Sequence, residues 1–96
     1  MHRKNISINV MEQVFGSLNL SKEILLNEMA IILAHQQLSE YKMKNDYYEK
    51  KYKKIFNSFD KDFRQTIASY DVENDWMSWK FAIESMNYWQ DILAQI

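Results

Sequence analysis

The apolar positions near the end of the chain repeat with the period of an α-helix. At 100° per residue, one stripe holds Trp79, Ala82, Met86, Trp89, Leu93 and Ile96. A second stripe beside it holds Met77, Phe81, Tyr88 and Ile92, and the polar strip that remains holds Lys80, Glu84, Asn87 and Asp91. A surface helix usually carries a narrower apolar stripe than these two together. The pattern predicts a helix over 73–96 that contacts two neighbours, one of them expected to be another polypeptide.

A longer apolar seam runs through the middle of the sequence. Its positions are spaced alternately three and four residues apart, which is the heptad pattern of paired helices. The seam predicts one long helix over 21–57, with a kink allowed at Asn45-Asp46 because Asp46 and Glu49 form a capping pattern. The seam positions are Ile24, Asn27, Ile31, Ala34, Leu38, Tyr41, Asn45, Tyr48, Tyr52, Ile55 and Phe59.

Two shorter helices complete the predicted set. Residues 8–15 fit a helix that ends at Gly16, although the alternation of Ile6, Ile8 and Val10 also fits a short strand. The polar residues at 57–60 provide capping groups for a helix over 60–69. That helix is expected to turn three apolar side chains inward, namely Phe59, Phe63 and Ile67.

The composition favours helices throughout. The chain has 96 residues, no proline and one glycine, so it lacks the residues that tight hairpin turns of a sheet usually require. No repeat or flexible linker divides it. The sequence therefore predicts an all-α fold and a single helical domain over 1–96, a small bundle or hairpin built on the long helix and the C-terminal helix.

The residue types that carry chemistry are scarce. There is no cysteine, and the only histidines are His2 and His35. Neither histidine has a ligand partner at the Glu-x-x-His spacing of helical metal sites. One glycine is too few for a phosphate-binding loop. We expect no catalytic residue, no metal and no cofactor, so the protein is predicted not to be an enzyme.

The sequence gives no sign of a membrane protein. The longest apolar run, over 24–34, is interrupted by Asn27 and Glu28 and falls short of the roughly 20 residues that span a bilayer. Absence of cysteine fits a reducing compartment, and we expect a cytoplasmic protein without membrane contact.

The charges are unevenly distributed. The net charge is −1, but the stretch Lys42–Arg64 is basic and the residues after it are mostly acidic. A nucleic-acid-binding regulator is the less favoured alternative, because a domain that binds nucleic acid normally has a high isoelectric point and this chain has about 6.1. Its candidate contacts are Lys50, Lys51, Lys53 and Lys54, interleaved with tyrosines that could stack on bases.

Aromatic residues supply the candidates for a protein interface. Tryptophan and tyrosine carry a large share of the binding energy at many interfaces. Trp76 lies at the opposite edge of the final helix from its main apolar stripe, together with Ile83. The predicted interface residues are Trp76, Phe81, Tyr88, Ile83, Tyr48 and Tyr52, whereas Trp79, Trp89, Phe56 and Phe59 are expected in the core.

Four segments in order resemble a family of small helical proteins encoded beside toxin genes in bacteria and archaea. They are Leu38–Tyr41, Tyr48–Tyr52, Phe56–Phe59 and Glu73–Ala82. The family usually has a glycine after the Lys-Tyr pair, where this chain has Lys53, and a polar cap where it has Ile55. These departures leave two alternatives, a helix break at this point or a seam that runs straight through it. Lys80 stands where an acidic residue is common.

The resemblance implies an antitoxin that neutralises a cognate toxin by direct contact. Its expected mechanism is coverage of the active surface of the toxin by helices. The expected partners are that toxin, a second copy of the chain in a homo-oligomer such as a dimer, or both. A purely structural homo-oligomer is the main alternative, because it needs only the apolar excess.

Overall fold

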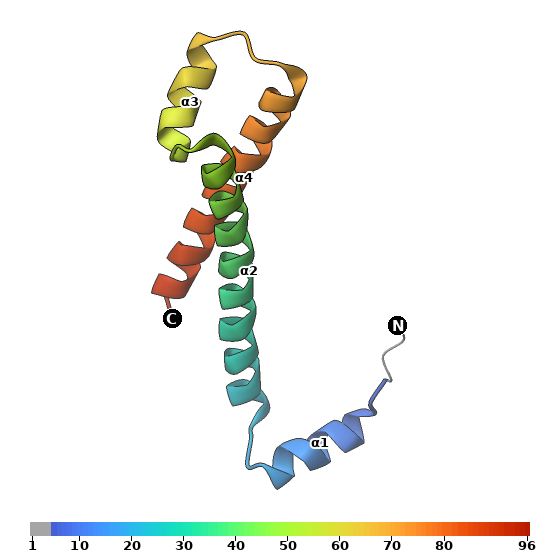
Figure 1. The fold of residues 1–96 in the computed structure, drawn as a ribbon. Coiled ribbons are helices and arrows are strands. Elements are labelled where there is room, and N and C mark those ends of the chain that lie inside the picture. Colours follow the sequence, from blue (N-terminus) through green and yellow to red (C-terminus); the bar gives the residue numbers. More distant parts are fainter. Residues whose placement is uncertain (1–4) are drawn as a thin grey trace. The chain divides into compact units, whose positions relative to one another are not determined.

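The protein is all-α, as the sequence predicts. The computed structural model describes residues 5–96, and these residues form four α-helices and no strand (Figure 1). The helices are α1 (Ile8–Ser17), α2 (Lys22–Tyr52), α3 (Phe56–Gln65) and α4 (Tyr70–Ala94).

The chain divides into two compact units, residues 1–32 and residues 33–96. We call the described part of the first, residues 5–32, the N-terminal unit. It contains α1 and the beginning of α2. The second, residues 33–96, is the hairpin unit and contains the rest of α2 with α3 and α4. The single folding domain inferred from the sequence stays a prediction.

The N-terminal unit begins with a helix where a strand was the alternative. The Ser7 side chain accepts a hydrogen bond from the Val10 backbone N–H at 3.3 Å, which caps the first turn of α1. The helix continues through Gly16 to Ser17, two residues beyond the predicted last residue, Phe15. The chain then turns at Asn19, whose φ of 54° is left-handed, a conformation that asparagine tolerates better than most residues.

The long helix α2 runs without interruption through Asn45-Asp46. It begins after Ser21, whose hydroxyl accepts a hydrogen bond from the Ile24 backbone N–H at 3.1 Å. It ends at Tyr52, five residues before the predicted end, because Lys53 takes a left-handed φ of 55°. Of the two alternatives left by the sequence, the helix break is therefore correct, although a lysine and not a glycine makes the turn.

Helix α3 lies earlier in the chain than predicted. It begins at Phe56, directly after the turn, and ends at Gln65. Phe56, Phe59 and Phe63 share one face, and Phe59 is buried. The expectation that Ile67 points inward is wrong. Ile67 follows the end of α3 and its side chain is fully exposed.

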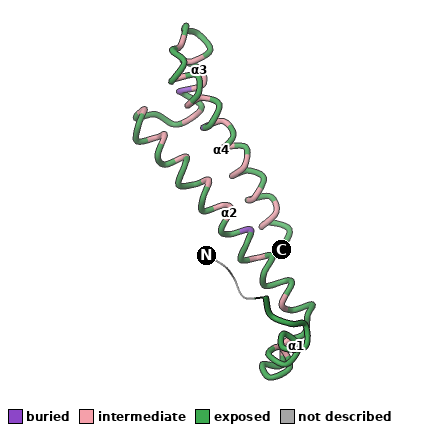
Figure 2. The backbone as a smooth tube through the Cα atoms, turned by 90° about the vertical axis from the view of Figure 1, so that its right-hand side faces the viewer, coloured by how far each residue is buried: buried purple, intermediate pink, exposed green. Residues whose placement is uncertain are grey.

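Helix α4 begins three residues before the predicted start. The Ser69 side chain accepts a hydrogen bond from the Val72 backbone N–H. Asp71 and Glu73 lie in the first turn, where their negative charges stabilise the helix by interacting with the positive end of its dipole. In the hairpin unit α4 runs antiparallel to α2 (Figure 1), and Figure 2 shows buried positions on α2 and on α3. Among the described residues, the buried ones are Ala34, Phe59, Trp79 and Ala82.

Candidate partner-binding groove

Trp79 forms the centre of the hairpin unit. Its side chain is fully buried, and its ring stacks on Tyr48 and Tyr52 of α2 at centroid distances of 5.6 and 6.0 Å. Phe59 of α3 lies 5.0 Å away on the same ring system. Aromatic pairs with this spacing add about 0.5–1.5 kcal/mol each beyond the area that they bury. Large rings, more than close backbone approach, thus hold α2, α3 and α4 together.

Hydrogen bonds fix the direction of the rings. The indole N–H of Trp79 donates to Asn45 Oδ1 at 2.9 Å, and the indole N–H of Trp76 donates to Asp60 Oδ1 at 2.8 Å. The second bond joins α4 to α3, where the Trp76 ring also stacks on Phe63 at 4.7 Å. A buried indole N–H without a partner costs stability, so these acceptors determine where each tryptophan can point.

A carboxylate of α4 binds two groups of α2. Asp75 Oδ2 accepts hydrogen bonds from Lys51 Nζ at 2.6 Å and from Tyr52 Oη at 2.5 Å. Burial and the hydrogen bond to Asp75 raise the pKa of Tyr52 to about 12. Burial alone would raise the pKa of Asp75, but the hydrogen bonds from Lys51 and Tyr52 outweigh it and hold that pKa below its ordinary value. At neutral pH the arrangement contains a carboxylate, an ammonium and a neutral phenol.

Asp60 of α3 has a similar role for Trp76, the residue that follows Asp75 in α4. The hydrogen bond from Trp76 lowers the pKa of this carboxyl most, and the neighbouring Arg64 lowers it further. Arg64 Nε lies 3.1 Å from Asp60 Oδ2. The charged form of Asp60 is therefore favoured, and it anchors Trp76 to α3.

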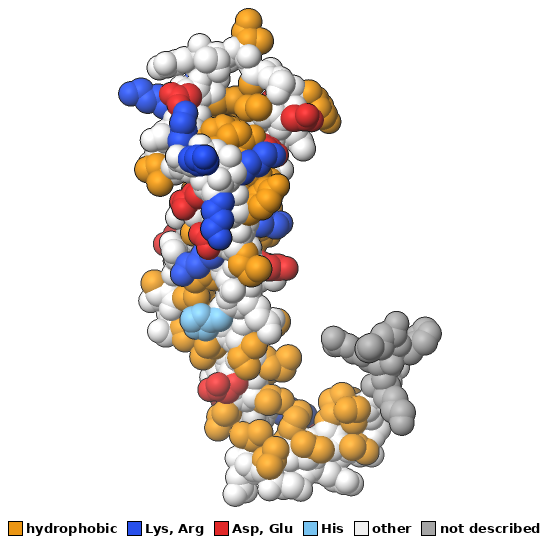
Figure 3. All heavy atoms as spheres, viewed as in Figure 1, with side chains coloured by type: hydrophobic (Ala, Val, Ile, Leu, Met, Phe, Trp, Pro, Cys, Tyr) orange, Lys and Arg blue, Asp and Glu red, His pale blue; other side chains and the backbone are white. Residues whose placement is uncertain are grey.

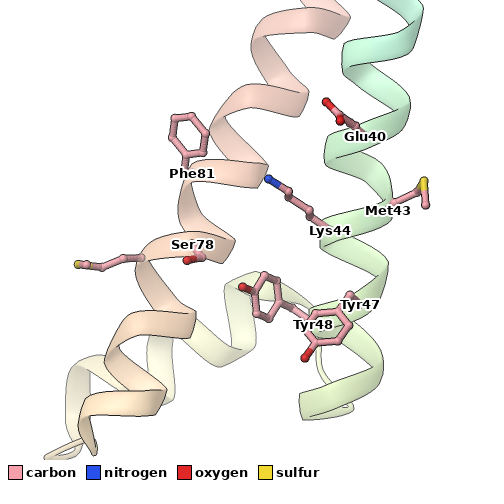
Figure 4. A pocket seen from close by; sticks show the side chains of 8 residues that line it. Glu40, Met43, Lys44, Tyr47, Tyr48, Ser78 and Phe81 are labelled. Carbon is pink, nitrogen blue, oxygen red and sulfur yellow. The ribbon is translucent and has the colours of Figure 1, made fainter. Parts of the chain in front are cut away.

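The helices held in this way leave a groove between α2 and α4. The groove encloses about 640 Å³ and opens to solvent. In Figure 4 Lys44 reaches from α2 towards α4, whereas Met43 lies at the far edge of α2. The lining residues are Glu40, Met43, Lys44, Tyr47 and Tyr48 from α2, and Met77, Ser78 and Phe81 from α4.

The groove combines apolar side chains with a few polar ones. Met43, Tyr47, Met77 and Phe81 are each more than half exposed. Glu40, Lys44 and Ser78 provide one acid, one base and one hydroxyl beside them. Flexible methionines next to aromatic rings are typical of surfaces that accept an apolar helix face. Such a surface is suited to bind a peptide or helix.

Two of the predicted interface residues line this groove, and a third extends its α4 edge. Tyr48 and Phe81 belong to the lining, with the Phe81 ring 5.8 Å from that of Tyr41. Tyr88 is 56% exposed on the same stripe of α4 as Phe81. The predicted second stripe is thus largely open to solvent, since Met77 and Phe81 are also exposed.

The other three predicted residues serve the interior of the hairpin unit. Tyr52 and Trp76 are half-buried in the contacts described above, and Ile83 lines a separate hollow with Asn45 and Phe56. Sequence reasoning missed Met43 and Tyr47. Their i, i+4 spacing places both side chains on one face of the long helix, which could have indicated a second apolar face. That face lies outside the heptad seam from which the core was predicted.

The four candidate nucleic-acid lysines are not equivalent. Lys51 pairs with Asp75 and Lys54 pairs with Asp62, whereas Lys50 and Lys53 are exposed without an ion pair among the described residues. Figure 3 shows Lys and Arg side chains interspersed with acidic ones over the end of α2 and α3. Two of the four candidate lysines are therefore already paired with carboxylates.

The described residues also offer no site for a metal ion and no helix that spans a membrane. No group of three or more His, Cys, Asp or Glu side chains in residues 5–96 is placed to hold a metal ion. His35 is exposed, and His2 lies outside the described residues. Within the same range, every helix is too short or too polar to cross a bilayer. No protein-family model, curated protein or solved structure matches the chain.

Proposed function

We propose that the chain is a non-enzymatic protein-binding module that receives a helix of a partner protein in the groove between α2 and α4. The observation that carries the proposal is the row of exposed apolar side chains on both walls, with Met43 and Tyr47 on one and Met77 and Phe81 on the other. A helix with an apolar stripe could lay it into such a groove and complete a three-helix bundle.

The proposed partner is the toxin of a toxin–antitoxin pair, and the proposed location is the cytoplasm. Support for this choice comes from the sequence resemblance over Leu38–Tyr41, Tyr48–Tyr52, Phe56–Phe59 and Glu73–Ala82. The second and fourth of these segments contribute Tyr48 and the α4 wall of the groove. Neutralisation would follow from the covering of the active surface of the toxin by the hairpin unit.

The test uses the protein encoded beside this chain in its genome as the partner. We expect that protein to arrest growth when expressed alone, and co-expression of this chain to restore growth. Phe81→Ala and Met77→Ala should each weaken the complex at least tenfold by calorimetry, because both side chains are exposed before binding and would be buried after it.

A matched control separates the groove from general surface effects. Ile67→Ala removes a fully exposed apolar side chain outside the groove and should leave the affinity unchanged. Trp76→Ala is unsuitable as a control, because Trp76 packs inside the hairpin unit. Unchanged affinity of both groove variants would contradict the site, and retention on nucleic acid that falls steeply with salt would favour the alternative function.

A further inference from the structure

A second hollow of the hairpin unit has a different chemistry from the groove. It encloses about 300 Å³, at the small end of the range for ligand pockets, and opens to solvent. Helices α2, α3 and α4 all contribute to its lining, and it shares no lining residue with the groove. We call it the amide hollow. Its lining consists of one carboxylate, three amides and three apolar side chains, namely Glu49, Asn45, Asn57, Asn87, Ile55, Phe56 and Ile83.

The carboxylate of the amide hollow is held in place from the core. The indole N–H of the buried Trp79 donates to Asn45 Oδ1 at 2.9 Å, and Asn45 Nδ2 donates to Glu49 Oε1 at 3.3 Å. Because an indole N–H can only donate, it turns the amide oxygen of Asn45 towards itself and leaves the amide N–H for Glu49. Glu49 is half-buried, and its second oxygen has no hydrogen-bond partner among residues 5–96.

No cation of the described chain pairs with Glu49. In an unbroken helix Lys53 would follow Glu49 at the i, i+4 spacing that favours an ion pair. Helix α2 ends at Tyr52, however, and the left-handed φ of Lys53 takes this lysine out of the helical register. The same turn that ends α2 thus leaves a half-buried carboxylate without a counter-charge beside an open hollow.

We propose that the amide hollow binds an arginine side chain of a partner polypeptide. A guanidinium group is a planar fork of N–H donors, so it can bond the Glu49 carboxylate and the amide oxygens of Asn57 and Asn87 together. Its apolar stem can pack on Ile55 and Ile83, which belong to the same lining. A lysine ammonium is a compact and strongly hydrated charge, and it fits several flat acceptors less well.

The lining favours an arginine within a polypeptide over free arginine. Free arginine carries an α-carboxylate, and the amide hollow contains no basic residue to receive it. Near Glu49 that second negative charge would be repelled. In a polypeptide the α-carboxylate is replaced by a peptide bond, which removes the repulsion. The proposed ligand is therefore an arginine side chain presented on the surface of another protein.

The test is a nuclear magnetic resonance titration of the full chain with three small probes. These are N-acetyl-arginine amide, N-acetyl-lysine amide and free arginine. We expect the capped arginine to shift the side-chain amide signals of Asn57 and Asn87, which line the hollow. It should bind at least about tenfold more tightly than the capped lysine, because more hydrogen bonds to polar and charged groups are made. Free arginine should bind more weakly than the capped form.

Two kinds of variant connect the binding to the hollow. Glu49→Gln keeps an acceptor for Asn45 but removes the charge, and it should weaken capped arginine at least about tenfold. Asp46→Asn is the matched control, because it removes an exposed carboxylate of α2 that lies outside the hollow, and it should leave the affinity unchanged. Asn87→Ala should weaken binding less than Glu49→Gln does. Circular dichroism should show unchanged helical content for all three.

Four outcomes would overturn the proposal. Absence of any shift at the hollow would mean that no guanidinium binds there, and equal binding of the capped lysine would mean simple charge attraction. Unchanged affinity of Glu49→Gln would place the binding elsewhere. Tighter binding of free arginine would identify an amino-acid site and not a protein contact. None of these measurements involves the groove, so each proposed site can fail while the other stands.

Discussion

The hairpin unit and the N-terminal unit bury their apolar residues to very different extents. In the hairpin unit Trp79 is completely buried and is surrounded by rings from three helices. In the N-terminal unit no residue reaches that state. Both units are helical and both are rich in apolar residues, so secondary structure does not explain the contrast.

The contrast follows from the size and chemistry of the side chains. Phe15 is the single aromatic residue before position 33, whereas every aromatic pair lies in the hairpin unit. An aromatic ring spans the distance between two helices and keeps a polar edge for a hydrogen bond, as Trp79 does with Asn45. Aliphatic side chains are shorter and need closer helices on several sides.

The largest expected effect comes from the centre of the hairpin unit. Trp79→Ala should lower the free energy of unfolding by about 3–5 kcal/mol, because it leaves a cavity where a fully buried indole packs. The same truncation at Leu18, which is 64% exposed, should change it by less than about 0.5 kcal/mol.

The measurement for this pair is urea unfolding followed by the remaining tryptophan fluorescence. Trp76, Trp79 and Trp89 all lie in α4, so the signal reports the hairpin unit alone. Equal losses for Trp79→Ala and Leu18→Ala would mean that the two units are not the distinct environments described here.

A smaller effect is expected from the Asp75 site, and it depends on pH. Tyr52→Phe should lower the free energy of unfolding by about 1 kcal/mol at pH 7, since one hydrogen bond to a carboxylate is lost. The folded pKa of Tyr52 is raised to about 12 from an unfolded value near 10. Its contribution is therefore complete below pH 10 and is lost as the pH rises towards 12.

The check is the unfolding midpoint of the wild type and of Tyr52→Phe from pH 8 to pH 12. The wild type should lose its advantage over the variant across the upper half of this range. Tyr88→Phe serves as the control, because Tyr88 is exposed and has no hydrogen-bond partner among the described residues. A constant difference between wild type and Tyr52→Phe would contradict the role of the phenol proton.

The smallest expected effect on stability comes from the turns that follow α1 and α2. Lys53 and Asn19 both adopt a left-handed φ, of 55° and 54°. Lys53→Gly should raise the free energy of unfolding by about 0.5–1 kcal/mol, because glycine adopts this conformation without a Cβ clash. Asn19→Gly should give a smaller gain, since asparagine already tolerates it. Thermal melts of both variants would show the order, and a destabilising Lys53→Gly would contradict the explanation.

The sequence predicted the helices better than it predicted their ends. Periodicity alone indicated the long helix and the C-terminal helix, because a 3.6-residue repeat over many turns has no other simple explanation. The ends depended on single residues. Lys53 carries no turn signal in its side chain, so the end of α2 and the early start of α3 could not be derived from it.

The candidate site was predicted in part for a similar reason. The second apolar stripe of α4 was visible in the sequence, and it contributes Met77 and Phe81 to the groove. The opposite wall, on α2, was not visible in the sequence, because Met43 and Tyr47 face away from the heptad seam. They line a groove only because α4 lies beside α2. Trp76 has the composition of an interface residue, yet in the hairpin unit it contacts Asp60 and Phe63.

The sequence by itself determined that the protein is all-α and that it has more apolar surface than one small core can bury. Both properties depend on the order and composition of residues along a helix, which are local. Only the tertiary structure decided which apolar residues form the core, because that depends on which helices meet. Trp79 is buried because Tyr48, Tyr52 and Phe59 reach it from other helices, whereas Leu26 stays 66% exposed.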